Sequence, residues 1–358
     1  MDFNREKFKD MLDVAKIAID QRDFIPILSH FCFSGSTMTA YNDLLGIRIP
    51  CKTNFVCALQ ANTLLQLINS TQAEIISIGF TANTAYLKTG KPRKGMRARL
   101  PYMGEDDFFF KWPNIKRLEK YKLTELQLKS FINGLQLCLS SVGDQHLTQM
   151  GIVISSLSRD VVLNSTNNKA ISRYAFRANM NCFNKDILPE SFCKAIIKAC
   201  EVYGTEEVEI RKAKDFMTIE WPNKCKIYSK LIHNKDPLDF DKVITEHLPA
   251  KYKELVCEFD TELEDSFRRA LIILSNELTK TVVVHIDEKL VTVEARSAAG
   301  KLKSSASFPK NLGKFRIRVD AEFVVKALEN TDKIFFCKKA IVFFKGGYMH
   351  LLSATMVE

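Results

Sequence analysis

The sequence predicts an α+β protein made of three tandem copies of one domain, each with two helices packed on antiparallel sheets. Three observations predict this architecture. Amphipathic helices begin near residues 8, 128 and 262, second helices begin near 61, 189 and 320, and strand-like segments follow every helix. The spacing of about 120–130 residues is far longer than a solenoid repeat, so each copy is a full domain. The expected domains are residues 1–118, 119–249 and 250–358.

The first helix of each copy has apolar residues every three or four positions, as at Phe8, Met11, Leu12 and Ala15. This period places the apolar side chains on one face, which must be buried. Each first helix leads into a predicted strand. The helices are expected at residues 8–20, 128–141 and 263–276, and the strands at 25–29, 151–154 and 281–286.

The second helix of each copy is followed by two more predicted strands. Pro189 suits a first helical turn, where its missing N–H costs nothing. These helices are expected at residues 61–70, 189–201 and 321–330, and short linkers near 113–122 and 247–253. The strands are expected at 74–78, 84–87, 207–210, 216–219, 333–336 and 340–344.

Composition restricts the class of protein. The chain has 358 residues, of which 46% are hydrophobic, and a formal net charge of +10. No apolar run reaches the length of a membrane span, and the N-terminus lacks the apolar segment of a secretory signal, so we expect a cytoplasmic protein without a membrane partner. None of the ten cysteines has zinc-site spacing, which indicates a reduced compartment and small core thiols.

Positive side chains recur on the outward faces of the predicted helices in all three copies. An excess of cations favours a polyanionic partner, nucleic acid first, although ordinary solvated helix faces are also charged. The densest basic run, residues 88–99, adds a predicted phosphate-contacting turn. The candidate DNA-binding residues are Arg5, Lys9, Lys16, Lys91, Arg93, Lys94, Lys129, Lys194, Lys198, Arg268, Arg269 and Lys326.

Sequence motifs for catalysis are absent. The chain contains no phosphate-binding loop, no Gly-x-Gly-x-x-Gly opening a helix and no Gly-x-Ser-x-Gly, and its six histidines are scattered. We therefore expect a protein that is not an enzyme and needs no metal or cofactor. An enzyme whose carboxylates meet only in space, such as a metal-dependent nuclease, stays an alternative.

Four stretches resemble the bacterial DNA polymerase III β sliding clamps or a phage-encoded relative. Arg22 with Ile25-Pro26-Ile27-Leu28 is similar to the family's Arg…Leu-Pro-Ile-Leu, and residues 151–171 are similar to a segment ending Ala-Thr-Asp-Gly-His-Arg-Leu. Residues 267–277 resemble Phe-x-Arg-Ala-x-Ile-Leu-Ser-Asn-Glu, and residues 348–353 resemble the family's C-terminal strand. The resemblance covers the whole length and agrees with the threefold repeat.

The resemblance implies a head-to-tail homodimer that closes a ring around double-stranded DNA without reading its sequence. Such a ring acts as a processivity factor. It tethers the replicative DNA polymerase and needs a clamp loader ATPase, because this chain has no nucleotide loop. The resemblance also places Arg22 and His146 in DNA-facing loops. A DNA-binding protein of the same modules that forms no ring is the alternative.

The resemblance further implies a pocket for a short partner peptide and a subunit interface. Residues 167–171 and the ending Ser353-Ala354-Thr355-Met356 depart from the family, so we expect a changed partner motif. The positive net charge also departs from the typically acidic bacterial clamps, which bears on dimer stability and non-specific DNA binding. The implied pocket residues are Gln149, Thr166, Asn168, Lys169, Ala170, Ile171, Leu238, Phe240, Lys242, Val243, Ala340, Leu351, Leu352, Ser353, Ala354, Thr355 and Met356. The implied interface residues are Phe108, Phe109, Phe110, Ile273 and Leu274.

Overall fold

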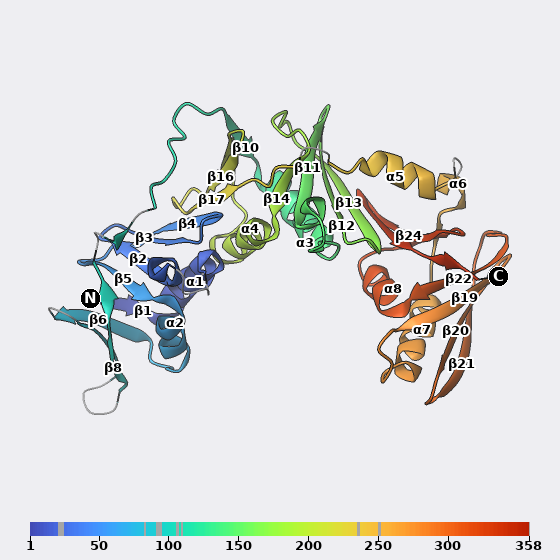
Figure 1. The fold of residues 1–358 in the computed structure, drawn as a ribbon, viewed down its shortest axis with the longest axis horizontal. Helices are drawn as coiled ribbons and strands as arrows, with labels where there is room; N and C mark the ends of the chain where they lie inside the picture. The colour runs from blue at the N-terminus through green and yellow to red at the C-terminus, as the bar shows by residue number, and fades with distance from the viewer. Residues whose placement is uncertain are drawn as a thin grey trace. The chain divides into compact units, whose positions relative to one another are not determined.

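The computed structural model describes the chain in two compact units (Figure 1). Unit 1 consists of Met1–Asn133 and Asp186–His233, and unit 2 consists of Gly134–Lys185 and Asn234–Glu358. The described residues are 1–20, 25–81, 84–90, 95–104, 107–108, 110–234, 237–249 and 252–357.

Unit 1 contains two antiparallel sheets and three helices that lie wholly within it. We call the smaller sheet, in which the order of strands is β1-β6-β7-β8, sheet A. The larger sheet has the order β10-β15-β16-β17-β4-β3-β2-β5-β9. Sheet A is formed by β1 (Asp2–Asn4), β6 (Ile75–Thr81), β7 (Thr84–Thr89) and β8 (Arg97–Leu100). The larger sheet is formed by β10 (Lys120–Leu123), β15 (Val208–Lys212), β16 (Phe216–Glu220), β17 (Lys226–Lys230), β4 (Leu45–Pro50), β3 (Thr37–Tyr41), β2 (His30–Ser34), β5 (Val56–Gln60) and β9 (Tyr102–Met103). The helices are α1 (Arg5–Ala15), α2 (Ala61–Asn69) and α4 (Glu190–Tyr203), and the short strand β14 (Asp186–Pro189) precedes α4.

Unit 2 also contains two antiparallel sheets. In one, strands run in the order β11-β12-β13-β25-β24-β23-β18, and in the other, which we call sheet D, in the order β21-β20-β19-β22-β26. The first is formed by β11 (Gly151–Leu157), β12 (Asp160–Thr166), β13 (Ala170–Arg177), β25 (Tyr348–Ser353), β24 (Ala340–Lys345), β23 (Lys333–Phe336) and β18 (Cys257–Glu258). Sheet D is formed by β21 (Gly300–Ser307), β20 (Leu290–Ser297), β19 (Thr281–Asp287), β22 (Lys314–Asp320) and β26 (Thr355–Met356). The helices are α5 (Phe240–His247), α6 (Tyr252–Leu255), α7 (Thr261–Ile273) and α8 (Ala321–Leu328), while α3 (Glu125–Leu139) spans the division between the units.

The sheets join neighbouring copies of the repeat. In unit 1, β17 of the second copy pairs with β4 of the first, with Ile227 opposite Ile47. In unit 2, β13 of the second copy pairs with β25 of the third, with Ile171 opposite Leu351. Because these ladders are continuous, each unit combines one terminal copy with part of the middle copy. The three domain boundaries stay a prediction.

The six predicted helices are present, and their apolar faces are buried. On α1, Phe8 and Leu12 are at most 1% exposed, and on α7, Leu263 and Phe267 are fully buried. Burying one such side chain stabilises the fold by about 1.5–3 kcal/mol. Side-chain caps begin several helices; on α1, for example, Asn4 Oδ1 accepts a hydrogen bond from the Lys7 amide at 3.1 Å. The helix α7 packs beside α8, and α1 packs beside both α2 and α4.

Three local predictions need correction. Residues 25–29 are not a strand, because Pro26 begins the 3₁₀ helix Pro26–Ser29, and strand pairing starts only at His30. The linker predicted at 113–122 is shorter, because β10 begins at Lys120. The strand β25 does not end the fold, because β26 follows it and pairs with β22.

All ten cysteines are free, and seven of them are buried. Burial raises the pKa of the Cys57 and Cys138 thiols to about 12, so both stay protonated and pack as small apolar groups. The prediction of core thiols is therefore confirmed for most of the cysteines.

Candidate nucleic-acid and partner-binding surfaces

Most of the predicted DNA-binding cations on helices are exposed, whereas Arg5, Lys9 and Lys198 are half-buried. Lys16 is exposed at the end of α1, whereas the side chain of Arg5 is only 20% exposed. Arg5 Nη1 donates a hydrogen bond to the Thr71 carbonyl at 2.8 Å, which fixes the start of α1 against the segment after α2. Arg5 therefore has a structural role in addition to any contact with DNA.

Acidic residues one turn away pair with most of the helix cations. Lys129 Nζ lies 2.6 Å from Glu125, Lys194 Nζ 2.5 Å from Glu190, and Lys326 Nζ 2.8 Å from Glu322. Arg268 bridges Glu264 at 2.6 Å and Glu329 at 2.7 Å, and Arg269 lies 3.6 Å from Asp265. Exposed pairs at this spacing contribute about 0.3–0.5 kcal/mol, so a phosphate can displace the carboxylate at little cost.

The surface where α1 meets α4 carries both signs of charge. A hydrogen bond from Lys198 to Glu201 raises the pKa of the lysine, and Asp13 and Asp10 of α1 raise it further. The cations on this surface are thus partly neutralised by their neighbours. Arg22, Lys91, Arg93 and Lys94, which were also predicted to contact DNA, lie outside the described residues, as does Phe109.

A groove of 300 Å³ lies within unit 2. Its floor is apolar, because Ala170, Ile171 and Leu351 are buried and Leu238 and Val243 are half-buried along one side. No acidic residue is among the described residues that line it. The lining is His146, Thr148, Gln149, Thr166, Asn168, Lys169, Ala170, Ile171, Leu238, Val243, His247, Leu351 and Ser353.

A tight turn between β12 and β13 shapes the polar rim of the groove. Asn167 Oδ1 accepts hydrogen bonds from the amides of Lys169 at 3.2 Å and Ala170 at 3.0 Å, which makes an Asx turn. Asn168 takes a φ of +67°, a left-handed conformation that asparagine tolerates. The Gln149 amide nitrogen donates to Asn168 Oδ1, and Asn168 in turn donates to Gln145.

One acceptor in the groove has no hydrogen-bond partner among the residues that the structure describes. Gln149 is 4% exposed, and its Oε1 atom is buried without a donor. A buried unsatisfied carbonyl costs about 1–3 kcal/mol, but this atom is closed to solvent and is therefore also closed to a ligand in this conformation. His247, the last residue of α5, also lines the groove, and its Nδ1 atom lies 2.8 Å from the Val243 carbonyl.

The structure brings ten of the predicted pocket residues together in this groove. The remaining predicted ones lie elsewhere: Ala340 and Leu352 are buried in the sheet, Phe240 is buried at the start of α5, and Lys242 is exposed outside the lining. Ala354 precedes β26, and Thr355 and Met356 form it. The groove also includes Thr148 and His247, which the sequence did not indicate, and His146, which was predicted to face DNA.

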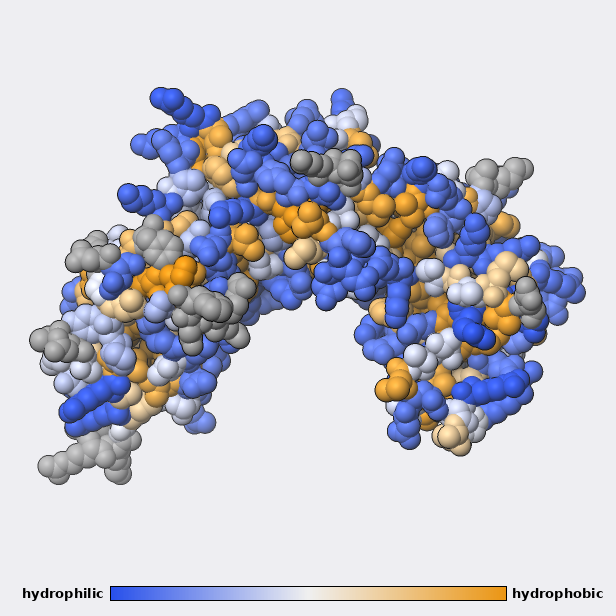
Figure 2. Space-filling model, in the orientation of Figure 1, coloured by the Kyte–Doolittle hydropathy of each residue, from blue (hydrophilic) through white to orange (hydrophobic). Residues whose placement is uncertain are grey.

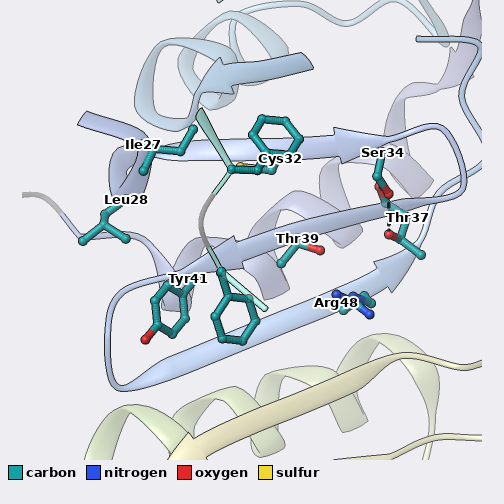
Figure 3. A pocket seen from close by; sticks show the side chains of 10 residues that line it. Ile27, Leu28, Cys32, Ser34, Thr37, Thr39, Tyr41 and Arg48 are labelled. Atoms are coloured by element: carbon teal, nitrogen blue, oxygen red, sulfur yellow. Dashed lines mark hydrogen bonds between the residues drawn. The ribbon is translucent and has the colours of Figure 1, made fainter. Parts of the chain in front are cut away.

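The predicted interface residues are mostly packed against their own unit. Phe110 stacks on Tyr41 with ring centroids 4.0 Å apart, and Phe108 and Phe110 close a cavity of 120 Å³ over β2, β3 and β4. Cys32, Thr39 and Arg48 point into this cavity from the three strands (Figure 3). In unit 2, Leu274 is 2% exposed in the core, Ile273 packs on that core, and neighbouring Ile272 is 71% exposed.

Neither a metal site nor a membrane-spanning helix is found in the part of the chain that the structure describes. No three or more His, Cys, Asp or Glu side chains there are placed to hold a metal ion. None of the helices described is both long and apolar enough to cross a membrane.

Comparison with known proteins gives no match in sequence, either to a family model or to a curated protein. Solved structures do match over the full length. A DNA polymerase III beta subunit from Thermotoga maritima matches with a TM-score of 0.84 at 12% identity, over 100% of this chain and 99% of that chain. A DNA polymerase sliding clamp from Pseudomonas aeruginosa matches with a TM-score of 0.80 at 15% identity, with the same coverage.

This chain has the sliding-clamp fold. A DNA polymerase III beta chain from Streptococcus pneumoniae shares the clamp fold with a TM-score of 0.79 at 18% identity, over 100% of this chain and 99% of that chain. The α+β class and the resemblance in sequence are therefore confirmed at the level of the fold. The shared fold explains why the two helices of each copy are backed by antiparallel strands.

Proposed function

We propose that this chain is a DNA sliding clamp: a protein without catalytic activity that closes around duplex DNA as a ring-shaped homodimer and keeps the replicative polymerase on its template. The observation that carries the proposal is the full-length likeness to polymerase III β subunits, at a TM-score of up to 0.84 among those compared. We place the protein in the cytoplasm of a bacterium or of a phage-infected cell.

The helix cations support a weak and mobile grip on DNA. Lys129, Lys194 and Lys326 each have a carboxylate one turn away, so a passing phosphate exchanges with that carboxylate. The exchange changes the energy little, because both pairs are exposed and screened. Contacts of this kind depend on the charge of the phosphates and not on the identity of the bases, which suits a ring that slides over any sequence.

The groove in unit 2 supports a binding site for a short peptide of the polymerase. Its apolar floor at Ile171 and Leu351 suits apolar side chains. Because no acidic residue is among its described lining residues and Lys169 lies at its rim, a peptide that also carries acidic groups would be accepted.

The homodimer is proposed to form through the predicted interface residues Phe108, Phe110, Ile273 and Leu274. Leu274 is buried and would hold the interface residues in place by packing beneath them. Ile272, which is exposed nearby, would add apolar contact area. A ring of this kind has to be opened by a separate loader with ATPase activity.

The first experiment tests whether the protein is held on DNA by topology. After loading with a clamp loader and ATP, we expect the protein to stay on closed circular DNA through a high-salt wash and to dissociate after one double-strand cut. Gel filtration with light scattering should give twice the chain's mass of 40.9 kDa. Equal retention on circular and linear DNA, or a monomer in solution, would contradict the ring.

A further inference from the structure

We propose that the outer face of sheet A in unit 1 is a second nucleic-acid site, which binds a single strand of DNA or RNA over a groove lined by Lys88, Arg97, Arg99 and Tyr86. This site is separate from the helix surfaces and from the peptide groove, and the proposal does not depend on the ring.

The groove lies on the side of sheet A that faces away from the core. Side chains alternate between the faces of a strand, and Ile76, Ile78 and Leu87 point into the core. Their neighbours therefore point outward and line a groove of 550 Å³, larger than the peptide groove of 300 Å³. The described lining is Met1, Ser77, Ile78, Gly79, Phe80, Thr81, Tyr86, Lys88, Arg97, Ala98 and Arg99.

The pairing of strands places the cations side by side. Lys88 of β7 lies opposite Arg97 of β8, and Tyr86 lies opposite Arg99. Successive residues on one face of a strand are about 7 Å apart, so the three cations form a short stepped row. Figure 2 shows hydrophilic side chains over the part of unit 1 where Figure 1 places β8.

These cations differ from the helix cations in having no carboxylate partner within the described residues. The side chains of Lys88, Arg97 and Arg99 are exposed, and none of them forms an ion pair with a residue that the structure describes. Asp2 lies beside Ser77 on this face, accepts a hydrogen bond from the Ser77 hydroxyl at 2.5 Å, and places one negative charge on β1, at the edge of sheet A opposite β8. Like charges directly opposite on neighbouring strands destabilise a sheet, so a bound phosphate would relieve the repulsion between Lys88 and Arg97.

The aromatic side chain of Tyr86, which lies among the cations, favours a single strand over a duplex as the ligand. The guanidinium of Arg99 lies over the Tyr86 ring, 5.6 Å from its centroid, and Gly79 opposite Tyr86 leaves open space above β6. A base can stack beside Tyr86 only if it is unpaired, because a duplex hides the faces of its bases. Cations that follow a backbone around a stacking aromatic are typical of single-strand sites.

The experiment measures binding of a short fluorescent oligothymidine to the full-length protein by anisotropy over a range of salt concentrations. We expect a log–log salt slope of about 2 if three phosphates are contacted, and the double variant R97E/R99E should lower the slope by about 1.4. Tyr86→Ala should weaken binding at least about fivefold, and Tyr86→Phe should restore it, because phenylalanine keeps the stacking face.

The control is the double variant K52E/K230E, which makes the same change of charge at two exposed positions of unit 1 outside the groove. It should keep at least half of the affinity at moderate salt. Thermal unfolding of every variant checks that the fold is intact. Equal losses in the groove variant and the control would overturn the proposal, since net charge alone would then explain binding.

A second competitor distinguishes nucleic acid from an acidic protein partner. Polyglutamate should compete poorly, and its binding should not respond to Tyr86→Ala. If polyglutamate competes as well as oligothymidine, or if Tyr86→Ala leaves oligothymidine binding unchanged, the site is not a single-strand site. Retention on circular duplex DNA by R97E/R99E should match the wild type, so failure here is separable from failure of the clamp proposal.

Discussion

Removing the carboxylates that pair with the helix lysines should make the protein hold duplex DNA more tightly. The perturbation is the triple variant E125Q/E190Q/E322Q, which frees Lys129, Lys194 and Lys326 without changing side-chain shape. The pairs are at 2.5–2.8 Å and exposed, and the lysines already lower the pKa of Glu125 and Glu322 through hydrogen bonds. Glu125 and Glu322 are thus charged at neutral pH and compete with phosphate for their lysines, and Glu190 makes the same contact with Lys194.

The expected size follows from the strength of the pairs. A phosphate that contacts Lys129, Lys194 or Lys326 has to displace a carboxylate that contributes about 0.3–0.5 kcal/mol. Removing all three carboxylates should therefore raise the affinity for duplex DNA by about 0.9–1.5 kcal/mol, or about 5- to 12-fold. The cost to the fold should be small, because each exposed pair contributes only about 0.3–0.5 kcal/mol.

The assay is the anisotropy of a short fluorescent duplex titrated with protein at several salt concentrations. The matched control is E207Q/D287N/E288Q, which removes three exposed acids that pair with Lys122 and Lys314 on strands. We expect the control to change the log–log salt slope by less than about 0.9, which is the contribution of one lysine–phosphate contact. An unchanged slope and affinity in the helix variant would refute the idea that these lysines meet phosphate.

Two further predictions concern the peptide groove and pH. Val243→Glu places a charge on the groove wall and should weaken binding of the replicative polymerase more than tenfold, as measured by surface plasmon resonance. The control is Thr245→Glu, which is exposed on the same helix but outside the groove lining and should not weaken binding. Equal effects of the two variants would contradict the groove assignment. Burial raises the pKa of Glu294, but Arg296, Lys301 and Lys303 outweigh it and lower this pKa to about 2. The carboxylate therefore stabilises the fold above its ordinary pKa of 4.5, and this contribution is lost as pH falls from about 4.5 towards 2. The full pKa shift corresponds to about 3 kcal/mol, and solvent screening of the exposed cations reduces this contribution to about 1 kcal/mol. The free energy of unfolding in urea should therefore differ between the wild type and Glu294→Gln by about 1 kcal/mol less in acid than at neutral pH. A difference that does not change with pH would contradict this prediction.

Local patterns in the sequence were sufficient for the six helices of the repeat and for all but one of the predicted strands, although many other strands and the helices α5 and α6 were not predicted. The apolar spacing that begins at Phe8 or Leu263 determines a helix wherever it lies in the fold, because the buried face depends only on residues within a few turns. The exposed face of a helix is likewise determined by the local period, so the cations at Lys194 and Lys326 were found from the sequence. The turn at Pro26 was missed because its apolar neighbours match a short strand equally well.

Tertiary structure alone decided which distant residues share a surface. The pairing of β17 with β4 and of β13 with β25 joins neighbouring copies through the backbone, and no side-chain period indicates such a ladder. The alternation along β25 puts Leu351 in the groove and Leu352 in the core, which depends on the register of the strand. The row of Lys88, Arg97 and Arg99 around Tyr86 likewise exists only because β7 and β8 pair in one register. A sequence determines the period of each element, whereas register is chosen by the packing of the whole sheet.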